Sequence, residues 1–226
     1  MMIDILEPYI PVVYYMAEAV GPTCEIVLHD VRKLENSIIA IANGHISERK
    51  IGDSATDLVL EILKDSSKYE NDSITNYISK SNSGKTFRSS TYFIRDSLKE
   101  IIGMLCVNID ISEYMEIDRI IHNLMAIDPK KTSQSNSIYS EKNFPIHENL
   151  TSDIDGIIKL AIKRVLGEKP VQKKRMLIEE KKEVVKLLNE KGLFLMKGSI
   201  TKVANYLGSS VPTLYRYISE ISNKED

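Results

Sequence analysis

The chain alternates between segments with helical periodicity and segments typical of strands. Near the N-terminus one apolar helical face ends at the helix-breaking pair Gly21-Pro22. The members of this face are Tyr9, Val13, Met16, Ala17 and Val20. Residues 24–31 and 37–44 are rich in β-branched side chains and are separated by a short polar stretch. This order predicts a helix followed by a β-hairpin.

A second helix and three more strands are predicted between residues 54 and 111. Ser54 and Asp57 have the spacing of a capping pair at the start of a helix, which is expected to end near Asp65. Three strand-like runs follow, joined by polar turn material, at residues 74–80, 85–96 and 100–111. About five antiparallel strands with helices inserted between them predict an α+β domain.

Two apolar stripes with helical spacing follow the strands. Ser112 is expected to cap a helix that packs on the sheet or on a partner, with the stripe Ile117, Ile120, Ile121, Leu124 and Met125. Thr151 or Ser152 is expected to start another helix ending near Gly167, with the stripe Ile154, Ile157, Ile158, Ala161, Ile162 and Val165. The second stripe must be buried, either in the core of one chain or between two copies of the chain.

The region between these two helices has a different character. Residues 128–149 are polar, contain Pro129 and Pro145, and show no sustained periodicity. We therefore interpret this region as an interdomain linker. The expected organisation is an α+β domain at residues 1–128, a linker at 129–150, a connecting or dimerisation helix at 151–169 and a small all-α domain at 170–226.

The last third of the chain predicts three short helices with the features of a helix-turn-helix motif. The first ends at Gly192, and the second begins after the cap candidate Ser199. Gly208 supplies the positive φ that the turn needs, and Ser210 caps the third helix. Ser209 stands where an apolar residue normally follows the turn glycine, so packing there is expected to be slightly weaker. The expected core positions are Val184, Val185, Leu187, Leu188, Ile200, Val203, Ala204, Leu207, Leu214, Tyr217 and Ile218.

Several side chains of the third helix remain outside this core and point outward, where a helix-turn-helix enters the major groove. The expected DNA-binding residues are Ser210, Val211, Thr213, Tyr215, Arg216 and Ser219, together with Lys202 on the second helix. The alternative is a three-helix lobe that binds a protein, with Tyr215 as a packing aromatic. Salt dependence separates the two interpretations, because DNA binding releases counterions.

Net charge divides the chain in two. From Lys159 to the end there are 15 Lys and Arg against 8 Asp and Glu, a net charge of +7. Residues 1–158 carry 15 against 24, a net charge of −9. Such asymmetry favours a polyanion as the partner of the C-terminal half. A solvated lysine-rich helix face gives the same excess, so charge alone does not decide between the interpretations.

The composition is that of an ordinary globular protein, with 42% apolar and 27% charged residues among 226. The two cysteines, Cys24 and Cys106, lie far apart in strand-like runs, which favours reduced core thiols over a disulfide. The sequence shows neither an export signal nor an apolar run of membrane-spanning length. We therefore expect a cytoplasmic protein without a membrane partner.

Five long phrases of the sequence resemble the YheO/DauR group of bacterial regulators. They lie at residues 29–31, 37–52, 84–96, 101–110 and 191–218, and they cover most of the chain outside the linker. Members of this group pair a YheO-like PAS domain with a DauR-type helix-turn-helix. The resemblance implies a PAS-like sensor at residues 1–128 coupled to DNA binding at residues 170–226, in a homodimer. It does not name the sensed molecule.

Polar side chains inside the strand-like phrases are candidates for binding an effector, because they are expected to be largely buried and buried polar groups need partners. They are His29, Asn43, His45, Arg49, Arg88, Ser90, Arg95 and Asn108. The alternative is that they satisfy one another and the edges of the sheet. His45 and Arg95 are the strongest single candidates. Arg95 suits an anionic effector, although Asp96 or Asp110 would serve equally as its partner.

Motifs for catalysis and for metal binding are absent from the sequence. The four histidines and two cysteines lack metal-ligand spacing, and neither a phosphate-binding glycine loop nor a nucleophile elbow is present. PAS-like pockets admit haem and flavin, with His29 and His45 as haem candidates, but no motif requires either cofactor. We expect a ligand-responsive DNA-binding regulator rather than an enzyme. A protein-interaction adaptor and an enzyme in the N-terminal domain are the alternatives.

Overall fold

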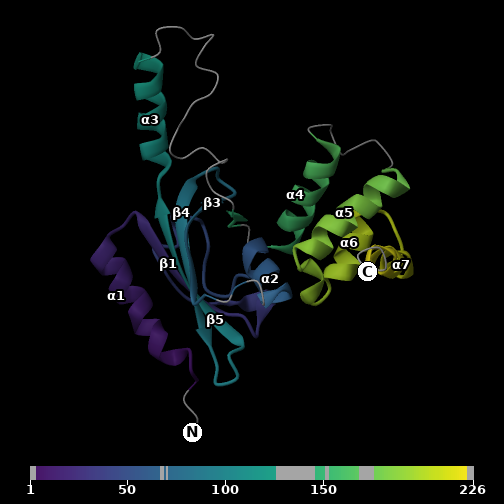
Figure 1. Cartoon of the computed structure of the whole chain (residues 1–226), viewed down its shortest axis with the longest axis horizontal. Coiled ribbons are helices and arrows are strands. Elements are labelled where there is room, and N and C mark those ends of the chain that lie inside the picture. The colour runs from purple at the N-terminus through teal and green to yellow at the C-terminus, as the bar shows by residue number, and fades with distance from the viewer. Residues whose placement is uncertain are drawn as a thin grey trace.

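The computed structural model describes residues 4–66, 69, 71–125, 146–150, 153–167 and 176–222. They form an N-terminal α+β domain and a C-terminal group of helices (Figure 1). The strands are β1 Cys24–Asp30, β2 Ile38–Ala42, β3 Ser73–Lys80, β4 Thr86–Arg95, β5 Ile101–Asp110 and β6 His147–Asn149. The helices are α1 Ile10–Val20, α2 Asp57–Lys64, α3 Ser112–Met125, α4 Ile154–Leu166, α5 Ile178–Glu190, α6 Ser199–Tyr206 and α7 Val211–Ser222, with short 3-10 turns at Glu7–Tyr9, Leu34–Asn36 and Leu193–Leu195. The α+β class predicted from the sequence is confirmed.

The strands form one six-stranded sheet in the order β2-β1-β5-β4-β3-β6. The five predicted strands pair antiparallel, including the hairpin of β1 with β2. The sixth strand, β6, pairs parallel with β3 and lies inside the region that we interpreted as linker. The linker interpretation is therefore wrong for residues 147–149. Three polar residues are too few to show a strand periodicity, and only pairing with β3 defines this strand.

The two faces of the sheet are covered by different helices. Helix α1 packs on one face through Val13 and Ala17, against residues such as Ile26 and Leu28. Helix α2 covers the opposite, inner face, and the two helices lie on opposite sides of the sheet in Figure 1. One contiguous apolar cluster joins the inner face to the core of the C-terminal helices. Val20, expected on the apolar face of α1, is 52% exposed because it lies at the end of the helix.

Three of the predicted helix starts differ in detail. Helix α2 is capped by Thr56, whose hydroxyl oxygen accepts a hydrogen bond from the amide of Val59, rather than by Ser54. Helix α4 is capped by the side chain of Asp153, whereas Thr151 and Ser152 lie outside the described residues. Ser199 is the first residue of α6, and its hydroxyl donates to the carbonyl of Met196 at 2.7 Å. A neighbouring polar residue therefore occupies the capping position of α2 and of α4, whereas Gly198 occupies that of α6 without a side-chain cap.

Helices α3 and α4 carry similar stripes but have different surroundings. Ile157, Ile158, Ala161 and Ile162 of α4 are buried within this chain, against α5 and α6. Helix α3 projects away from the sheet (Figure 1), and the described part of its stripe is exposed. That part consists of Ile117, Ile120, Ile121 and Leu124. The stripe of α4 is therefore intrachain core, and the stripe of α3 has no intrachain cover among the described residues.

The predicted helix-turn-helix geometry is present in α6 and α7. Gly208 has a φ of +55°, and the amide of Ser209 donates to the carbonyl of Ala204 at 2.9 Å. The buried side chains between the helices include Val203, Leu207 and Leu214. Ser209 is half-buried, and its hydroxyl contacts the amino group of Lys181 at 3.2 Å, so a polar partner replaces the apolar contact usual there. None of the described helices combines the length and apolarity needed to cross a membrane.

Candidate functional site

Polar side chains cross the inner face of the sheet in one continuous row. Antiparallel register sets Glu25 of β1 opposite Asn108 of β5, and Asn108 opposite Ser89 of β4. Ser89 in turn lies opposite Tyr77 of β3. All four residues are buried. We call them, together with His29, Ser47, Arg49, Thr56, Thr91, Cys106 and Glu148, the inner-face network.

The carboxylate of Glu25 organises one half of this network. It forms an ion pair with the guanidinium of Arg49 and accepts a hydrogen bond from the hydroxyl of Ser47. The side-chain amide of Asn108 donates to Glu25 Oε1 at 2.9 Å. Burial disfavours the charged guanidinium, but the carboxylates of Glu25 and Glu148 outweigh burial and raise the pKa of Arg49. The guanidinium therefore keeps its charge although the Arg49 side chain is only 2% exposed.

Asn108 leaves one polar atom without a partner. Its Nδ2 must face Glu25, because a carboxylate can only accept, and this fixes the orientation of the amide. Its Oδ1 is buried and has no hydrogen-bond partner within the described part of the chain. Such an atom costs about 1–3 kcal/mol when it stays unsatisfied. A water molecule or a ligand donor at this position would recover that energy.

His29 lies beside the charged pair and is held neutral. Its Nδ1 shares a hydrogen bond of 2.9 Å with the hydroxyl of Ser37. Burial, reinforced by the positive charge of Arg49, lowers the pKa of the imidazole to about 3. His29 therefore contributes polarity without charge to the network near neutral pH.

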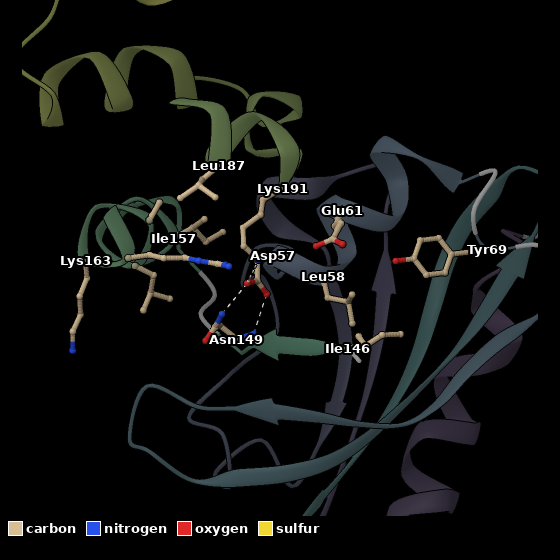
Figure 2. A pocket seen from close by; sticks show the side chains of 13 residues that line it. Asp57, Leu58, Glu61, Tyr69, Ile146, Asn149, Ile157, Lys163, Leu187 and Lys191 are labelled. Atoms are coloured by element: carbon tan, nitrogen blue, oxygen red, sulfur yellow. Dashed lines mark hydrogen bonds and ion pairs between the residues drawn. The ribbon is translucent and has the colours of Figure 1, made fainter. Parts of the chain in front are cut away.

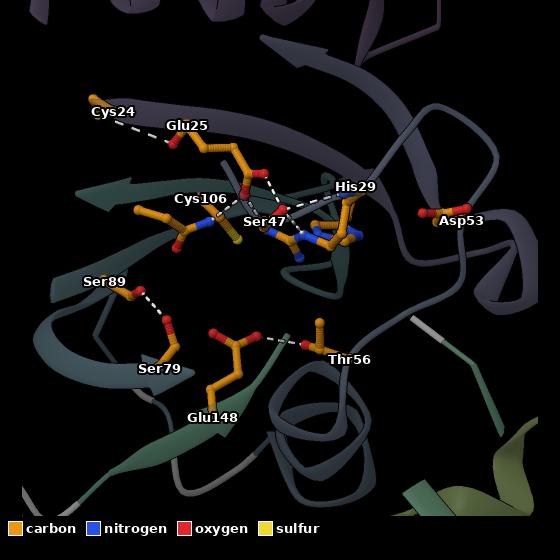
Figure 3. Close-up of polar contacts among 12 residues, drawn as sticks. Cys24, Glu25, His29, Ser47, Asp53, Thr56, Ser79, Ser89, Cys106 and Glu148 are labelled. Carbon is orange, nitrogen blue, oxygen red and sulfur yellow. Dashed lines mark hydrogen bonds and ion pairs between the residues drawn. The ribbon is translucent and has the colours of Figure 1, made fainter. Parts of the chain in front are cut away.

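Glu148 of β6 forms the other half of the network, and Figure 3 shows it facing the group of Glu25, Ser47 and His29. Its carboxylate accepts hydrogen bonds from Thr56 Oγ1 at 2.5 Å and from the Tyr77 hydroxyl at 3.1 Å. Burial raises the pKa of Glu148, although the charge of Arg49 opposes the shift. The network thus contains two buried carboxylates that share the field of one arginine.

Cys106 and Tyr77 complete this second half in their neutral forms. The thiol of Cys106 lies 3.3 Å from Thr91 Oγ1, which is 2.9 Å from the Tyr77 hydroxyl. Burial and the charge of Glu148 raise the pKa of Cys106 to about 12 and the pKa of Tyr77 well above its ordinary value. Both cysteines are buried and free, as the sequence predicted. A protonated, enclosed thiol is a packing and hydrogen-bonding group rather than a nucleophile.

The strand β6 connects the network to the C-terminal helices. Glu148 points into the core, while the next residue, Asn149, faces α2. Its backbone amide and its side-chain amide each donate to the carboxylate of Asp57 at 2.9 Å (Figure 2). The amino group of Lys191, just after α5, binds the same carboxylate at 2.9 Å. Thr56 caps α2 and Asp57 is its first residue, so two adjacent residues at the start of α2 and two of β6 link the core of the α+β domain to the helical domain.

Three further contacts hold the helical domain against α2 and its neighbours. The amino group of Lys64 donates to the carbonyl of Asn189 at 2.5 Å, and the amide of Lys197 donates to the carboxylate of Glu35 at 2.8 Å. Gly192 has a φ of +68°, and a Cβ there would lie 2.5 Å from the carbonyl oxygen of Leu60. The glycine that ends the first predicted helix is therefore also required for close approach between the domains.

The expected DNA-binding residues lie together at the C-terminal end of the molecule. Ser210, Tyr215, Arg216 and Ser219 are exposed, and Val211 and Thr213 are half-buried. Ser210 caps α7 by accepting the amide of Thr213 at 3.3 Å. The Arg216 guanidinium lies over the ring of Tyr217 at 5.7 Å and has Glu220 at 3.8 Å. Lys202 is less available, because its amino group binds Asp155 of α4 at 2.8 Å.

The expected ligand-binding residues divide into two groups. His29, Arg49 and Asn108 meet in the inner-face network. Asn43 binds the carbonyls of Gly21 and Cys24, and Ser90 accepts the amide of Asn76. Arg95 donates to the carbonyls of Lys99 and Tyr69, so neither Asp96 nor Asp110 is the partner seen here. His45 and Arg88 are exposed, contrary to the expected burial.

Strand alternation explains the division, and it also identifies the residues that were missed. Ser89 and Thr91 point to the inner face, so the intervening Ser90 and the preceding Arg88 point to the other. Glu25 shares the inner face with His29 by the same period, and a glutamate within the apolar run of β1 was the available signal. Thr56, Tyr77 and Glu148 carried no comparable signal. No cluster of histidine, cysteine or acidic side chains suited to a metal ion occurs among the described residues.

Comparisons with known proteins match both parts of the chain. A family model described as a YheO-like PAS domain matches residues 2–126, and a model described as an HTH domain matches residues 157–219. The uncharacterised protein YheO of Escherichia coli K12 is 30% identical over 222 residues, covering 97% of this chain and 86% of that protein. An uncharacterised protein of Haemophilus influenzae is 28% identical, covering 98% of this chain and 93% of its own length. The transcriptional regulator DauR of Pseudomonas aeruginosa is 27% identical, covering 98% and 96% respectively.

Proposed function

Because this chain belongs to the YheO-like PAS family and is a transcriptional regulator with a C-terminal helix-turn-helix domain, we propose that its PAS domain senses a small polar molecule that modulates DNA binding. The observation that carries the proposal is the inner-face network, and within it the unpaired Oδ1 of Asn108. A core built only for stability has little use for two buried carboxylates and an arginine, since apolar residues of similar volume are often as stable.

The chemistry of the network limits the class of molecule. Asn108 Oδ1 can only accept, so the ligand must supply an N–H or O–H donor at that point. Glu25, Arg49 and Glu148 are already charge-compensated or hydrogen-bonded, and His29 is neutral. A small neutral or zwitterionic molecule with several hydrogen-bonding groups fits this environment. A bulky apolar molecule does not.

The route from the network to the DNA-binding domain runs through β6 and the start of α2. A ligand that forms a hydrogen bond with Glu148 or Arg49 alters the hydrogen bond that Thr56, the cap of α2, donates to Glu148. Asp57, the next residue, holds both Asn149 and Lys191. These contacts form a physically continuous chain between the two domains, and they are the element that ligand binding would bias.

DNA binding is assigned to the outer face of α7. Its exposed side chains Tyr215 and Arg216 are directed away from the packed core of the domain. Arg216 is the candidate for a base edge, because a guanidinium can bind guanine through two hydrogen bonds. Lys202 is better suited to a phosphate once its ion pair with Asp155 exchanges. A regulator with this partner acts where the DNA is, so we infer a cytoplasmic protein without an enzymatic role.

We further propose a homodimer in which α3 pairs with α3 of a second copy. The α4 stripe is occupied inside the chain, so of the two stripes predicted as seams only α3 is free among the described residues. Its Leu124 is 81% exposed. A single helix-turn-helix module usually needs a second half-site. Leu124→Ser and Ile121→Ser should therefore yield a monomer by light scattering at micromolar concentration, and a wild-type monomer would contradict the assignment.

Calorimetry tests the sensing proposal as a whole. A molecule that raises the thermal midpoint of the full chain is titrated into the protein with and without its operator DNA. Coupling is reciprocal, so operator must change the affinity for that molecule by the same factor by which the molecule changes affinity for operator. Asn108→Ala should weaken its binding, whereas Ser90→Ala, on the opposite face of the same sheet, should not. Equal effector affinities with and without operator would exclude that molecule as the signal.

A further inference from the structure

A cleft between the two domains lies apart from the inner-face network. Its volume is about 600 Å³, within the range of small-molecule sites, which favour domain interfaces. Residues of α2 and β6 line one side, and residues of α4 and α5 line the other (Figure 2). The cleft is not lined by the charged residues of the network, Glu25, Arg49 and Glu148. A molecule in this cleft would touch both domains at once.

The cleft has an apolar wall. Leu58 from α2, Ile157 and Leu160 from α4, and Leu187 from α5 contribute to it. Leu160 is 41% exposed, although the residues of the α4 stripe around it are buried. An apolar side chain that faces a cavity at a domain interface gains free energy when an apolar ligand covers it. The wall therefore favours a ligand with an aromatic or branched aliphatic body.

The charges around the cleft select the ligand's polar group. Asp57 and Lys191 neutralise each other, and Asp57 is further bound by Asn149. Figure 2 shows the side chain of Lys163 directed away from the other labelled lining residues, so its charge does not face the cleft. Arg164 of α4 and Glu61 of α2 are exposed lining residues, and neither forms an ion pair within the described residues. Arg164 is therefore the lining cation that an acidic group of a ligand can bind.

We propose that this cleft binds an amphipathic organic anion, with its apolar body against Leu58, Leu160 and Leu187 and its acidic group paired with Arg164. A guanidinium binds a carboxylate or sulfonate through two parallel hydrogen bonds, which gives direction as well as affinity. This site is separate from the proposed sensor site in the PAS core. Because its ligand contacts α2 together with α4 and α5, it stabilises the arrangement in which the domains are docked.

The probe for the test is 8-anilinonaphthalene-1-sulfonate, an aromatic body with one sulfonate group. It is titrated into the full chain by fluorescence and by calorimetry. We expect one saturable site per chain. Arg164→Glu should weaken binding about tenfold or more, since a hydrogen-bonded charge partner becomes a repulsive one. Arg164→Gln should weaken it less, and Leu160→Ser should weaken it through lost apolar contact.

Two control variants separate this site from others. The dye also binds loosely to exposed apolar surface, so a control outside the cleft is needed. Leu124→Ser removes the most exposed apolar side chain of α3 and should leave probe affinity for the cleft unchanged. Asn108→Ala, in the PAS core, should also leave it unchanged, so failure of the sensor proposal and failure of this one are distinguishable. Unchanged affinity in both Arg164 variants, or loss of the site in Leu124→Ser, would overturn the proposal. Circular dichroism and the thermal midpoint establish that each variant is folded.

Discussion

Arg49 and Arg216 show how the same kind of side chain serves opposite ends of this molecule. The side chain of Arg49 is 2% exposed and has Glu25 as a fixed partner, while that of Arg216 is 66% exposed and stays largely available. A buried polar group must be satisfied within the protein, whereas an exposed one can be satisfied by a partner. The comparison therefore predicts that changes in the inner-face network affect folding, and that changes on the outer face of α7 affect DNA affinity.

The largest effect is expected at the buried ion pair. Arg49→Leu leaves the carboxylate of Glu25 buried without its cation, and breaking such a pair costs about 3–5 kcal/mol of unfolding free energy. Urea denaturation of the full chain measures it. Arg88→Leu is the matched control, because Arg88 is exposed on the opposite face of the sheet and should change stability by no more than about 0.5 kcal/mol. Equal costs for the two variants would refute the distinction.

His29 gives the network a defined dependence on pH. Its folded pKa of about 3 lies below its ordinary value of 6.5, so the unfolded chain binds the extra proton as pH falls below 6.5. The stability that neutral His29 contributes is therefore complete above pH 6.5 and falls by about 2 kcal/mol on going from pH 8 to pH 5. The raised pKa of Glu148 acts in the opposite direction at acidic pH, so a variant is needed to isolate His29.

His29→Gln supplies that comparison. Unfolding free energies of the wild type and of this variant are measured at several pH values between 8 and 5. We expect the wild type to lose about 2 kcal/mol more than the variant over this range. Parallel pH profiles for the two proteins would show that His29 does not stay neutral in the folded state.

On the exposed side of the comparison, Arg216→Ala should reduce affinity for the best DNA site by about 1–3 kcal/mol without changing stability. Fluorescence anisotropy at fixed salt measures the affinity. Arg119→Ala on α3 is the control, since Arg119 is equally exposed but lies far along the chain and pairs with Glu116. A uniform loss across all sequences would assign Arg216 to a phosphate. An unaltered affinity would remove it from the interface.

The smallest effect is expected at Ser210, which should affect both the stability of the protein and its affinity for DNA. It caps α7 and is also exposed on the outer face. Loss of a serine cap costs about 0.5–2 kcal/mol, so Ser210→Ala should lower both the unfolding free energy and the DNA affinity. Ser219→Ala, exposed near the other end of α7, should leave stability unchanged. A stable Ser210→Ala variant would mean that the cap does not act in solution.

The helix-turn-helix and the inner-face network also differ in how far the sequence predicts them. The turn at Gly208 and the cap at Ser210 depend on residues a few positions apart, so local pattern is sufficient. The inner-face network joins Asn108 to Glu25 across 83 positions, and Thr56 to Glu148 across 92. No local periodicity encodes such pairs. Strand alternation alone selects among polar residues within a strand, and applying it to β4 favours Ser89 over Arg88.

Helices α3 and α4 show that the sequence alone also does not predict which apolar helix face is buried within the chain. Both have apolar residues at helical spacing, and both predict a buried face. Only the tertiary structure distinguishes the stripe of α4, buried against α5 and α6, from the stripe of α3, which is exposed within this chain. β6 is a further example, because a strand of three polar residues is defined by its partner β3 rather than by its own sequence.

The most direct test of coupling between the PAS core and DNA binding is the operator affinity of Glu148→Gln. This variant keeps the shape of the side chain, removes its charge and lies far along the chain from α7, with Thr56, Asp57 and Lys191 as the connecting contacts. Coupling of about 1–3 kcal/mol predicts a change in operator affinity of roughly fivefold or more in the folded protein. An operator affinity equal to that of the wild type would contradict the coupling.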